Sequence, residues 1–396
     1  MTTSWLGRVL EVEVGAVAHG GHCVARAEGR VVFVRHALPG EQVRVEITED
    51  NGGSFCRGDA VEVLTPSPHR VPPPCPLAVP GGCGGCDWQH ASPDHQRELK
   101  AAVVAEQLQR LAGIERDVVV EALDGGPLDW RSRVRLVAGH DGRAGLRAHH
   151  SHRVVALEDC PIAVPGELDD VLARRWRPGS ELEVTQDADG GVHVRELSTV
   201  RGKVRARQLS GGIAVQHAAG RDWRLDAHGF WQVHPAAAST LAAVVAEWAE
   251  APVGGSAWDL YAGVGLFASV LASQVGTSGR VLAVESGRRA VADGESNLAD
   301  LPQVSWQAGR VEHVLASAAT PVDVVVLDPP RKGAGKAVVE SIVAGAPDRI
   351  VYVACDPAAL ARDVATFASH GYSLTDLRAF DAFPMTHHVE CVALLS

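Results

Sequence analysis

The sequence contains no apolar run long enough to span a bilayer. The N-terminal segment MTTSWLGRVLEVEVG lacks the charged-then-apolar pattern of a secretion signal, so we expect a cytoplasmic protein without membrane contact. An excess of positive charge is also missing, since the formal net charge is −11. Because proteins that grip phosphates unselectively are usually basic, a nucleic acid would have to be selected by its shape.

A disulfide framework is equally unexpected. The chain has eight cysteines, and in a cytoplasmic protein this number favours metal binding or catalysis. With 396 residues, the chain is long enough for two or three domains with a sizeable core.

Positive charge is unevenly distributed along the acidic chain. Six arginines and a single acid, Asp141, lie between Arg131 and Arg153. A second run contains Arg201, Lys203, Arg205 and Arg207. These residues could form a local basic face, but alternating arginines also fit the solvated side of ordinary strands, and the two interpretations have equal weight.

Three regions follow from the patterns along the chain. Residues 1–66 alternate apolar and charged side chains between glycine turns, which predicts a small β barrel, and a linker with five prolines from Pro66 to Pro74 follows it. Residues 67–220 predict a central domain with antiparallel strands and a helix over 93–112, which could pack on the third region. Residues 221–396 alternate strands and helices, as in a doubly wound α/β sheet.

The loop CPLAVPGGCGGCDWQH places three thiols close together in the central region. Cys83 and Cys86 are separated by two residues, Cys75 lies just upstream, and Cys160, followed by proline, is the best fourth ligand. A Cys₄ site of this kind suits either zinc or an iron–sulfur cluster. The residues alone slightly favour zinc, although a second closely spaced pair is lacking.

Cys355 stands between a predicted strand, RIVYVA, and a helix that begins at Pro357. Ligands bind at the ends of strands in such sheets, and a helix N-terminus favours thiolate, so Cys355 is a candidate nucleophile. The alternative is a buried cysteine that acts as a small hydrophobe. On this stretch alone the two interpretations are about even.

Two further turns of the α/β region suggest a ligand that carries ribose. Gly263 and Gly265 let the backbone approach a ligand, and Glu285 follows at the distance where an acid accepts hydrogen bonds from ribose hydroxyls. The third glycine of the dinucleotide fingerprint is absent, because Ala268 occupies its position. A tight turn with an exposed acid is the alternative. Asp328 is followed by two prolines, which we expect to fix the loop and aim this acid into the same crevice, although a generic strand terminator is the alternative.

An acid–proline–proline loop with a cysteine one strand later suggests methylation at carbon. Carbon 5 of uracil becomes nucleophilic only after a thiolate adds to carbon 6, and a base must later remove the proton from carbon 5. Glu390 interrupts an apolar strand near the C-terminus and is the candidate base. His387 and His388 are its rivals.

The segments VAHGGHCVARAEGRVVFVRHALPGEQVRVEI, GFWQVHP, DLYAGVGLF, LDPPRKG, YVACDPAALARD and THHVECVALL resemble the RNA uridine carbon-5 methyltransferases of the TrmA and RlmD type, which carry an N-terminal TRAM domain. The resemblance implies a class I methyltransferase fold with a seven-stranded sheet and an OB-like barrel, and an RNA partner, either rRNA or tRNA. It implies Cys355 as nucleophile and Glu390 as general base. It also implies S-adenosylmethionine contacts at Gln232, Tyr261, Gly263, Gly265, Glu285 and Asp328, and 4Fe-4S cluster ligands at Cys75, Cys83, Cys86 and Cys160.

The chain departs from the family pattern at three places. Leu266 stands where many members have asparagine, which leaves at most a backbone contact to the cofactor there. Asp356 follows the nucleophile where members commonly have asparagine, and the spacing from Cys75 to Cys83 is longer than usual.

Two other functions compete with uridine methylation. One is methylation of cytosine or of an exocyclic amine. The other is a noncatalytic RNA-binding scaffold with a metal-stabilised loop. The sequence does not specify an oligomeric state, and a monomer is the default expectation.

Overall fold

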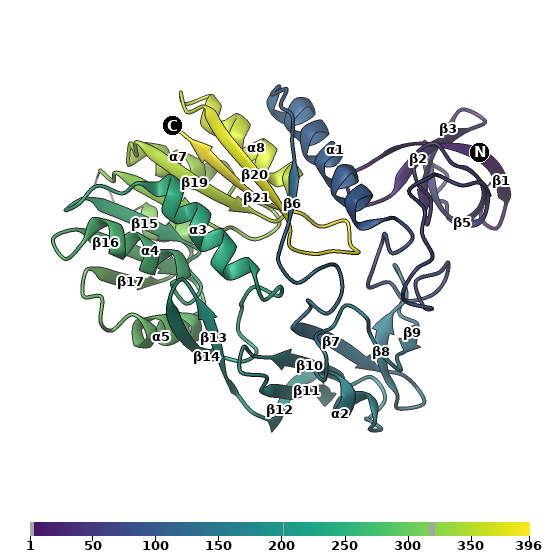
Figure 1. The fold of residues 1–396 in the computed structure, drawn as a ribbon, viewed down its shortest axis with the longest axis horizontal. Helices are drawn as coiled ribbons and strands as arrows, with labels where there is room; N and C mark the ends of the chain where they lie inside the picture. Colours follow the sequence, from purple (N-terminus) through teal and green to yellow (C-terminus); the bar gives the residue numbers. More distant parts are fainter. Residues whose placement is uncertain (1–3, 201, 317–320) are drawn as a thin grey trace.

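The computed structural model describes residues 4–200, 202–316 and 321–396. Figure 1 shows a β barrel at the upper right, a large sheet flanked by helices on the left, and a smaller β region below them. The long helix α1 (Pro93–Ala112) lies between the barrel and the large sheet. Within the described ranges, no helix has both the length and the apolar character that crossing a bilayer requires.

Five N-terminal strands close the barrel in the order β1-β2-β3-β5-β4. In β4, Val43, Val45 and Ile47 are buried and alternate with exposed charged residues. This period of two gives the barrel one apolar interior. The strands are β1 (Val9–Val17), β2 (Cys23–Ala27), β3 (Arg30–Arg35), β4 (Gln42–Glu49) and β5 (Phe55–Thr65).

The central region contains an antiparallel sheet of six strands in the order β12-β11-β10-β7-β8-β9. A separate hairpin packs against helix α5 of the α/β region, so the expected boundary near residue 220 falls inside this hairpin. The sheet comprises β7 (Arg133–Ala138), β8 (Ala144–Arg147), β9 (Val154–Ala156), β10 (Glu181–Gln186), β11 (Val192–Val200) and β12 (Lys203–Ser210), with α2 (Asp169–Leu172), and the hairpin is β13 (Ile213–Ala218) and β14 (Arg221–Asp226).

The C-terminal region confirms the expected α/β methyltransferase-like architecture. Its sheet has the order β17-β16-β15-β18-β19-β21-β20, and the short strand β6 (Val120–Ala122) adds an eighth strand beside β20. The other strands are β15 (Ser256–Leu260), β16 (Arg280–Glu285), β17 (Val304–Ala308), β18 (Val324–Leu327), β19 (Arg349–Ala354), β20 (Leu374–Asp381) and β21 (Glu390–Leu395). The helices are α3 (Ala237–Ala249), α4 (Leu266–Val275), α5 (Arg288–Asn297), α6 (Val311–Leu315), α7 (Lys336–Ala344) and α8 (Pro357–Ala368).

Helix α1 packs on α8 of the α/β region. Ser92 precedes it in extended conformation, Pro93 occupies its first turn, and Gly113 ends it with φ 68° in the left-handed region. Val104 and Leu108 enter the same hydrophobic core as α8. The helix is therefore fixed against the large sheet by its apolar face.

One edge of the large sheet collects the ends of several strands. Strands β15, β16, β18 and β19 are parallel, so their carboxyl ends share this edge. Strand β21 runs antiparallel to β19, and therefore its first residue lies at the same edge. Ligands bind at this edge in open α/β sheets.

Candidate active site

Cys355 and Glu390 emerge at neighbouring positions of this edge. In the register of β19 and β21, Ala354 pairs with Cys391. Cys355 directly follows Ala354, and Glu390 directly precedes Cys391. The negative charge of Glu390 acts on the Cys355 thiol, as expected for two groups that lie close together. The candidate nucleophile and base, 35 residues apart in the sequence, therefore share one small site.

The electrostatic environment of Cys355 differs from the sequence-based expectation. The half-buried thiol has its pKa raised to about 12, chiefly by burial and then by the negative charges of Glu390 and Asp328. The guanidinium of Arg331 acts in the opposite direction and lowers this pKa. Burial and two carboxyl groups thus outweigh the helix N-terminus, which the sequence led us to expect would favour thiolate.

Glu390 is 2% exposed, and its pKa is raised well above the ordinary value by burial and by the charge of Asp328. Burial also raises the pKa of Asp328, to about 7. Two carboxyl groups that share a site cannot both ionise cheaply, and such a pair suits proton transfer.

The residue after the nucleophile starts helix α8. Asp356 accepts a hydrogen bond from the Ala359 backbone N–H (2.7 Å) through one carboxylate oxygen, as an N-cap residue does. Its other oxygen lies 3.1 Å from His19 Nε2 in the barrel. Asp356 therefore fixes the turn that carries Cys355 and joins it to the barrel.

The loop after β18, residues 328–335, is held from behind by Asp363 of α8. This buried carboxylate accepts hydrogen bonds from the Tyr352 hydroxyl (2.7 Å) and from the Ala334 N–H (2.7 Å). A Cβ atom at Gly333 would lie 2.6 Å from the same carboxylate, so only glycine fits there. Asp363 was not singled out in the sequence as a functional residue, because its role depends on contacts 29 residues away.

The turn after β15 forms the other half of the site. Tyr261 is half-buried with φ 64°, and Gly263 follows with φ 56° and open space where a side chain would be. At Gly265 a Cβ atom would lie 2.9 Å from the Trp306 ring, which requires glycine. Glu285, at the end of β16, accepts a hydrogen bond from the Gly263 N–H (3.1 Å). These four predicted cofactor residues are thus brought together.

Asp259, at the base of this turn, was missed as a site residue. It is fully buried, and one carboxylate oxygen accepts a hydrogen bond from the Ala268 N–H in α4 (2.7 Å). The other oxygen has no hydrogen-bond partner among the described residues. Burial raises the pKa of Asp259 to about 7. Only its position at the end of the apolar strand AWDLYAG could have indicated a role.

Two other residues of the predicted cofactor region lie in packed surroundings. Leu266 is 8% exposed and enters the hydrophobic core, so its side chain fills space rather than facing a ligand. Gln232 is half-buried in the segment between β14 and α3, next to Trp231 of that same core.

The four predicted metal ligands converge between the linker and the central sheet. Cys83 and Cys160 influence each other electrostatically, as do Cys86 and Cys160, and Cys75 and Cys160. Cys75 is buried and the other three are half-buried. Among the described residues, no three of these sulfurs come within 4.8 Å of one another.

Donors around the thiols are arranged to support negative sulfur. The Gly85 N–H donates to Cys83 Sγ (3.4 Å), and Gln89 Nε2 donates to Cys86 Sγ (3.1 Å). Burial raises the pKa of Cys86 to about 12, whereas the Arg131 charge acts to lower it. A Cβ atom at Gly84 would lie 2.7 Å from the backbone nitrogen of His149, so the loop closely follows the central sheet.

Comparisons with known proteins agree with this geometry. Residues 4–61 match the TRAM domain, and residues 309–396 match the tRNA (Uracil-5-)-methyltransferase family. A Streptomyces avermitilis protein named "Uncharacterized RNA methyltransferase" is 48% identical, over 98% of each chain. A similarly named Bifidobacterium longum protein is 41% identical, over 98% of this chain and 96% of that protein. The chain belongs to the RNA uracil-5-methyltransferase family.

A solved structure supports the fold of this uracil-5-methyltransferase family member. The Pyrococcus abyssi tRNA (uracil-54, C5)-methyltransferase, determined in complex with S-adenosyl-L-homocysteine, superposes with a TM-score of 0.72. It is 22% identical, and the match covers 97% of this chain and 99% of that chain. As a family member, the protein is an S-adenosylmethionine-dependent RNA methyltransferase, as its sequence predicts.

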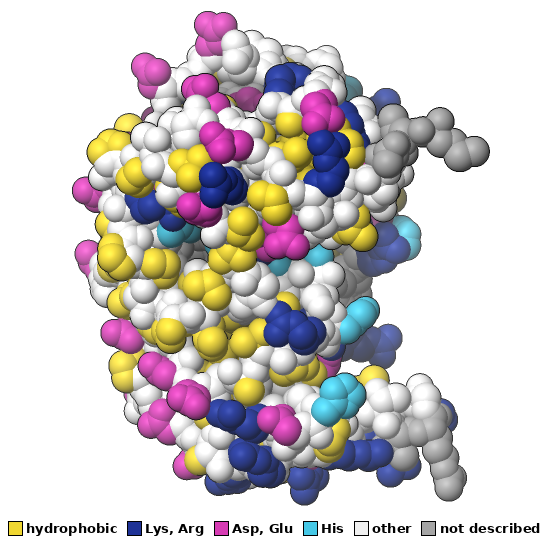
Figure 2. All heavy atoms as spheres, turned by 90° about the vertical axis from the view of Figure 1, so that its right-hand side faces the viewer, with side chains coloured by type: hydrophobic (Ala, Val, Ile, Leu, Met, Phe, Trp, Pro, Cys, Tyr) yellow, Lys and Arg dark blue, Asp and Glu magenta, His cyan; other side chains and the backbone are white. Residues whose placement is uncertain are grey.

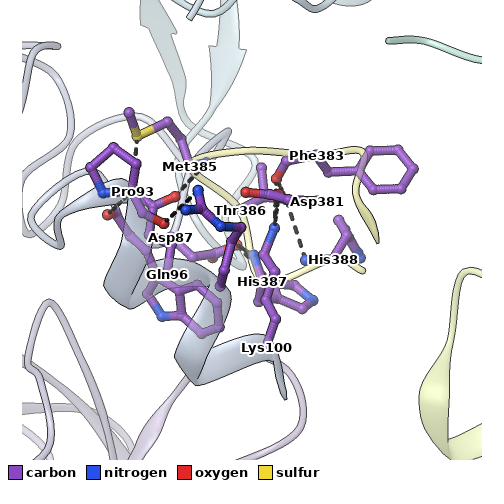
Figure 3. Close-up of polar contacts among 12 residues, drawn as sticks. Asp87, Pro93, Gln96, Lys100, Asp381, Phe383, Met385, Thr386, His387 and His388 are labelled. Carbon is purple, nitrogen blue, oxygen red and sulfur yellow. Dashed lines mark hydrogen bonds and ion pairs between the residues drawn. The ribbon is translucent and has the colours of Figure 1, made fainter. Parts of the chain in front are cut away.

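The rival bases to Glu390 in this methyltransferase are engaged elsewhere. His387 Nδ1 lies 2.7 Å from a carboxylate oxygen of Asp87. Figure 3 draws both residues within one group of polar contacts. Burial lowers the pKa of His388 to about 3, and its ring contacts Phe383 edge to face.

The basic segments of the methyltransferase are partly neutralised. Arg135, Arg143 and Arg147 form ion pairs with glutamates of the central region. Strand β12 carries exposed Lys203 and Arg205 at the sheet edge, and Arg201 lies outside the described residues. Figure 2 shows Lys and Arg side chains gathered at the lower end of the molecule with acidic side chains among them.

A second group of ligand-type atoms joins the linker to the start of α1. His69, His95 and Glu98 bring three such atoms within 4.8 Å of one another. The two rings stack with centroids 4.2 Å apart, and His95 Nδ1 lies 2.7 Å from the Glu98 carboxylate. These contacts among themselves account for the group.

Proposed function

We propose that the protein methylates carbon 5 of a uridine in structured RNA, either rRNA or tRNA, through a covalent adduct with Cys355. The observation that supports this proposal is that Ala354 pairs with Cys391 at the ligand edge of the sheet, and that the charge of Glu390 acts on the neighbouring Cys355 thiol. A nucleophile and a base on one face are what addition to carbon 6 and deprotonation of carbon 5 require.

The reaction assigns separate steps to the two side chains. Cys355 gives its proton to solvent and its sulfur bonds to carbon 6, which places the electron pair on carbon 5. S-adenosylmethionine supplies the methyl group that carbon 5 takes up. Glu390 as carboxylate then removes the proton from carbon 5, and the carbon 6–sulfur bond breaks to release Cys355. Because its pKa is raised, Glu390 must first release its own proton to solvent, and it then holds the proton taken from carbon 5 firmly.

The residues of the β15 and β16 turns suit S-adenosylmethionine. Gly263 leaves room for a close backbone approach, and the position of the acid Glu285 at the end of β16 supports its assignment to ribose hydroxyls. Asp328 lies between this turn and Cys355, because its N–H donates to the Leu260 carbonyl of β15 (3.2 Å). We assign Tyr261 and Gln232 to the same cofactor on the family resemblance.

We assign Cys75, Cys83, Cys86 and Cys160 to a 4Fe-4S cluster on the family resemblance, with zinc as the alternative. The mutual electrostatic influence of these thiols supports a shared site. N–H donors to two of the sulfurs are the kind of contact that tunes such clusters. Iron, sulfide and zinc analysis after anaerobic purification distinguishes them.

The test of function uses two variants with opposite consequences for the adduct. Cys355→Ala should abolish both methyl transfer and covalent attachment of RNA. Glu390→Gln should form a methylated adduct that survives denaturing electrophoresis, because the proton on carbon 5 stays in place. The nucleoside formed by the wild type is identified by mass spectrometry, with cellular RNA from a deletion strain as substrate. Absence of an adduct in Glu390→Gln would contradict the mechanism.

Other products would indicate the competing functions. 5-Methylcytidine or a methylated exocyclic amine would indicate a different target base at the same site. RNA binding that survives both substitutions, without any consumption of S-adenosylmethionine by the wild type, would indicate a scaffold.

A further inference from the structure

The loop that precedes Glu390 is held by side chains from distant parts of the chain. We call residues 382–389 the base loop, because they connect the end of β20 at Asp381 with Glu390, the first residue of β21. Figure 1 shows this loop in yellow, extending from the large sheet toward the lower end of α1. The end of a strand frays readily unless its connection is fixed, so contacts to the base loop bear on the position of Glu390.

Lys100 makes the first set of contacts to the base loop. Its side chain is fully buried on α1, and Nζ donates to Asp381 Oδ1 (2.5 Å) and to the Phe383 carbonyl (3.0 Å). Figure 3 shows the ammonium group directed at the start of the base loop. A buried ion pair adds little stability compared with apolar residues of the same volume, and its best-attested use is to specify one arrangement.

Gln96, one turn earlier on α1, makes the second set of contacts to the base loop. Its Oε1 accepts a hydrogen bond from the Met385 N–H (2.8 Å), and its Nε2 donates to the Trp88 and Ala91 carbonyls. Met385 has φ 66°, a left-handed conformation that a methionine rarely adopts. Strain of this kind persists only where surrounding contacts impose it.

Asp87, which follows Cys86 in the thiol-bearing loop, makes the third set of contacts to the base loop. The N–H groups of Asp87 and Trp88 both donate to the Met385 carbonyl (2.9 and 3.0 Å), and the Asp87 carboxylate accepts a hydrogen bond from the His387 N–H (3.1 Å). Met385 packs in one small hydrophobic cluster with Cys86 and Cys160. The base loop is thus clamped between α1 and the segment that carries the thiols.

We propose that Lys100, Gln96 and Asp87 are positioning residues that hold Glu390 near Cys355, and that they act on removal of the proton from carbon 5. This inference rests on the proposed function, because that step exists only in the adduct mechanism. A displacement of about 1 Å at a catalytic group can lower a rate about 100-fold. Loss of the clamp should therefore resemble a defect of Glu390 rather than a loss of substrate binding.

The test compares clamp variants with a matched ion-pair variant on the same strand. Lys100→Met removes the buried charge, and Lys100→Met with Asp381→Asn removes both charges in case the single variant does not fold. Asp87→Ala releases His387 without touching that pair. Arg116→Met is the control, because Arg116 pairs with Asp376 near the other end of β20 (2.7 Å). Turnover, KM for RNA and S-adenosylmethionine, and the fraction of protein covalently bound to RNA are measured in a thermal range where circular dichroism shows folded protein.

The clamp variants should lose about 10- to 100-fold in kcat with both KM values within about twofold of wild type. Their covalent RNA fraction should rise toward that of Glu390→Gln, whereas Arg116→Met should match wild type in each measurement. Unchanged turnover in folded clamp variants, or lost turnover without more adduct, overturns the proposal. If Glu390→Gln itself gives no adduct, the proposed function fails first, and the clamp inference falls with it.

Discussion

The Tyr352 hydroxyl donates a hydrogen bond of 2.7 Å to Asp363, near the middle of helix α8. The same carboxylate accepts the Ala334 N–H, so strand β19, helix α8 and the loop after β18 are joined at one group. Asp328 and Arg331, which both act on the pKa of Cys355, belong to that loop. A residue without a ligand contact thereby determines where the charges of the site lie.

Asp363→Ala should destabilise the protein by about 2–4 kcal/mol, because it leaves the Tyr352 hydroxyl and the loop N–H groups without their acceptor. Tyr352→Phe should cost about 1 kcal/mol. We also expect about tenfold weaker binding of S-adenosylmethionine by Asp363→Ala, because Asp328 moves with the loop. Chemical denaturation and calorimetry measure the two effects, with Ser341→Ala on the exposed side of α7 as control. An unaltered affinity of Asp363→Ala for S-adenosylmethionine would show that the position of the loop after β18 does not affect cofactor binding.

Asp356→Ala should cost about 0.5–2 kcal/mol of stability through loss of the N-cap of α8. Asp356→Asn should cost little, because asparagine caps helices as well as aspartate does. Thermal melts at pH 7 distinguish the two variants. Equal melting temperatures for the alanine and asparagine variants would mean that the cap hydrogen bond contributes nothing.

Arg331→Met should slow alkylation of Cys355 by iodoacetamide about twofold at pH 8, since the exposed guanidinium lowers the pKa of this thiol. The rate should rise with pH in both proteins without a plateau below pH 9, because the pKa of Cys355 is about 12. Mass spectrometry of the Cys355 peptide separates this thiol from the seven other cysteines of the chain. The difference in alkylation rate between Arg331→Met and the wild type should shrink in high salt. Lys332→Met, which changes the next residue of the loop, should be alkylated at the wild-type rate.

Asp259→Asn should alter how stability depends on pH. Because burial raises the pKa of Asp259 from 3.8 to about 7, the native state holds this proton between about pH 4 and pH 7 while the unfolded state releases it. The wild type should therefore lose free energy of unfolding over this range, by at most about 4 kcal/mol from this group, and no further above pH 7. The free energy of unfolding of the variant minus that of the wild type should therefore rise from pH 4 to pH 7 and then level off. Denaturation curves recorded at several pH values measure this difference. A constant difference would show that Asp259 keeps an ordinary pKa.

Local patterns predicted much of the site. The apolar strand RIVYVA, the acid at 356 and Pro357 together specify a strand-to-helix turn, and the structure has β19, an N-cap and α8 there. The turn at Gly263 and Gly265 was predictable for the same reason, since backbone positions with φ above zero favour glycine. The pKa of Cys355 was not predictable, because the carboxyl groups that raise it come from other strands.

Long-range contacts could not be predicted from the sequence. Strand β6 adds an eighth strand beside β20 although its three residues are separated from it by more than 250 positions. Lys100 looks like the polar residue of an ordinary surface helix, yet it is buried against Asp381. Neither feature leaves a periodic signal, because each depends on which segments meet.

The sequence by itself determined the kinds of element and their order, since alternation, caps and glycine turns act within a few residues. It also determined the set of reactive groups: one thiol at a strand end, one acid in an apolar strand, and four cysteines near two turns. Only the tertiary structure decided that Glu390 lies near Cys355 and that α1 and the thiol loop hold the segment between Asp381 and Glu390. The physical reason is that strand register and buried ion pairs arise from packing between segments far apart in the chain, where local preferences carry no information.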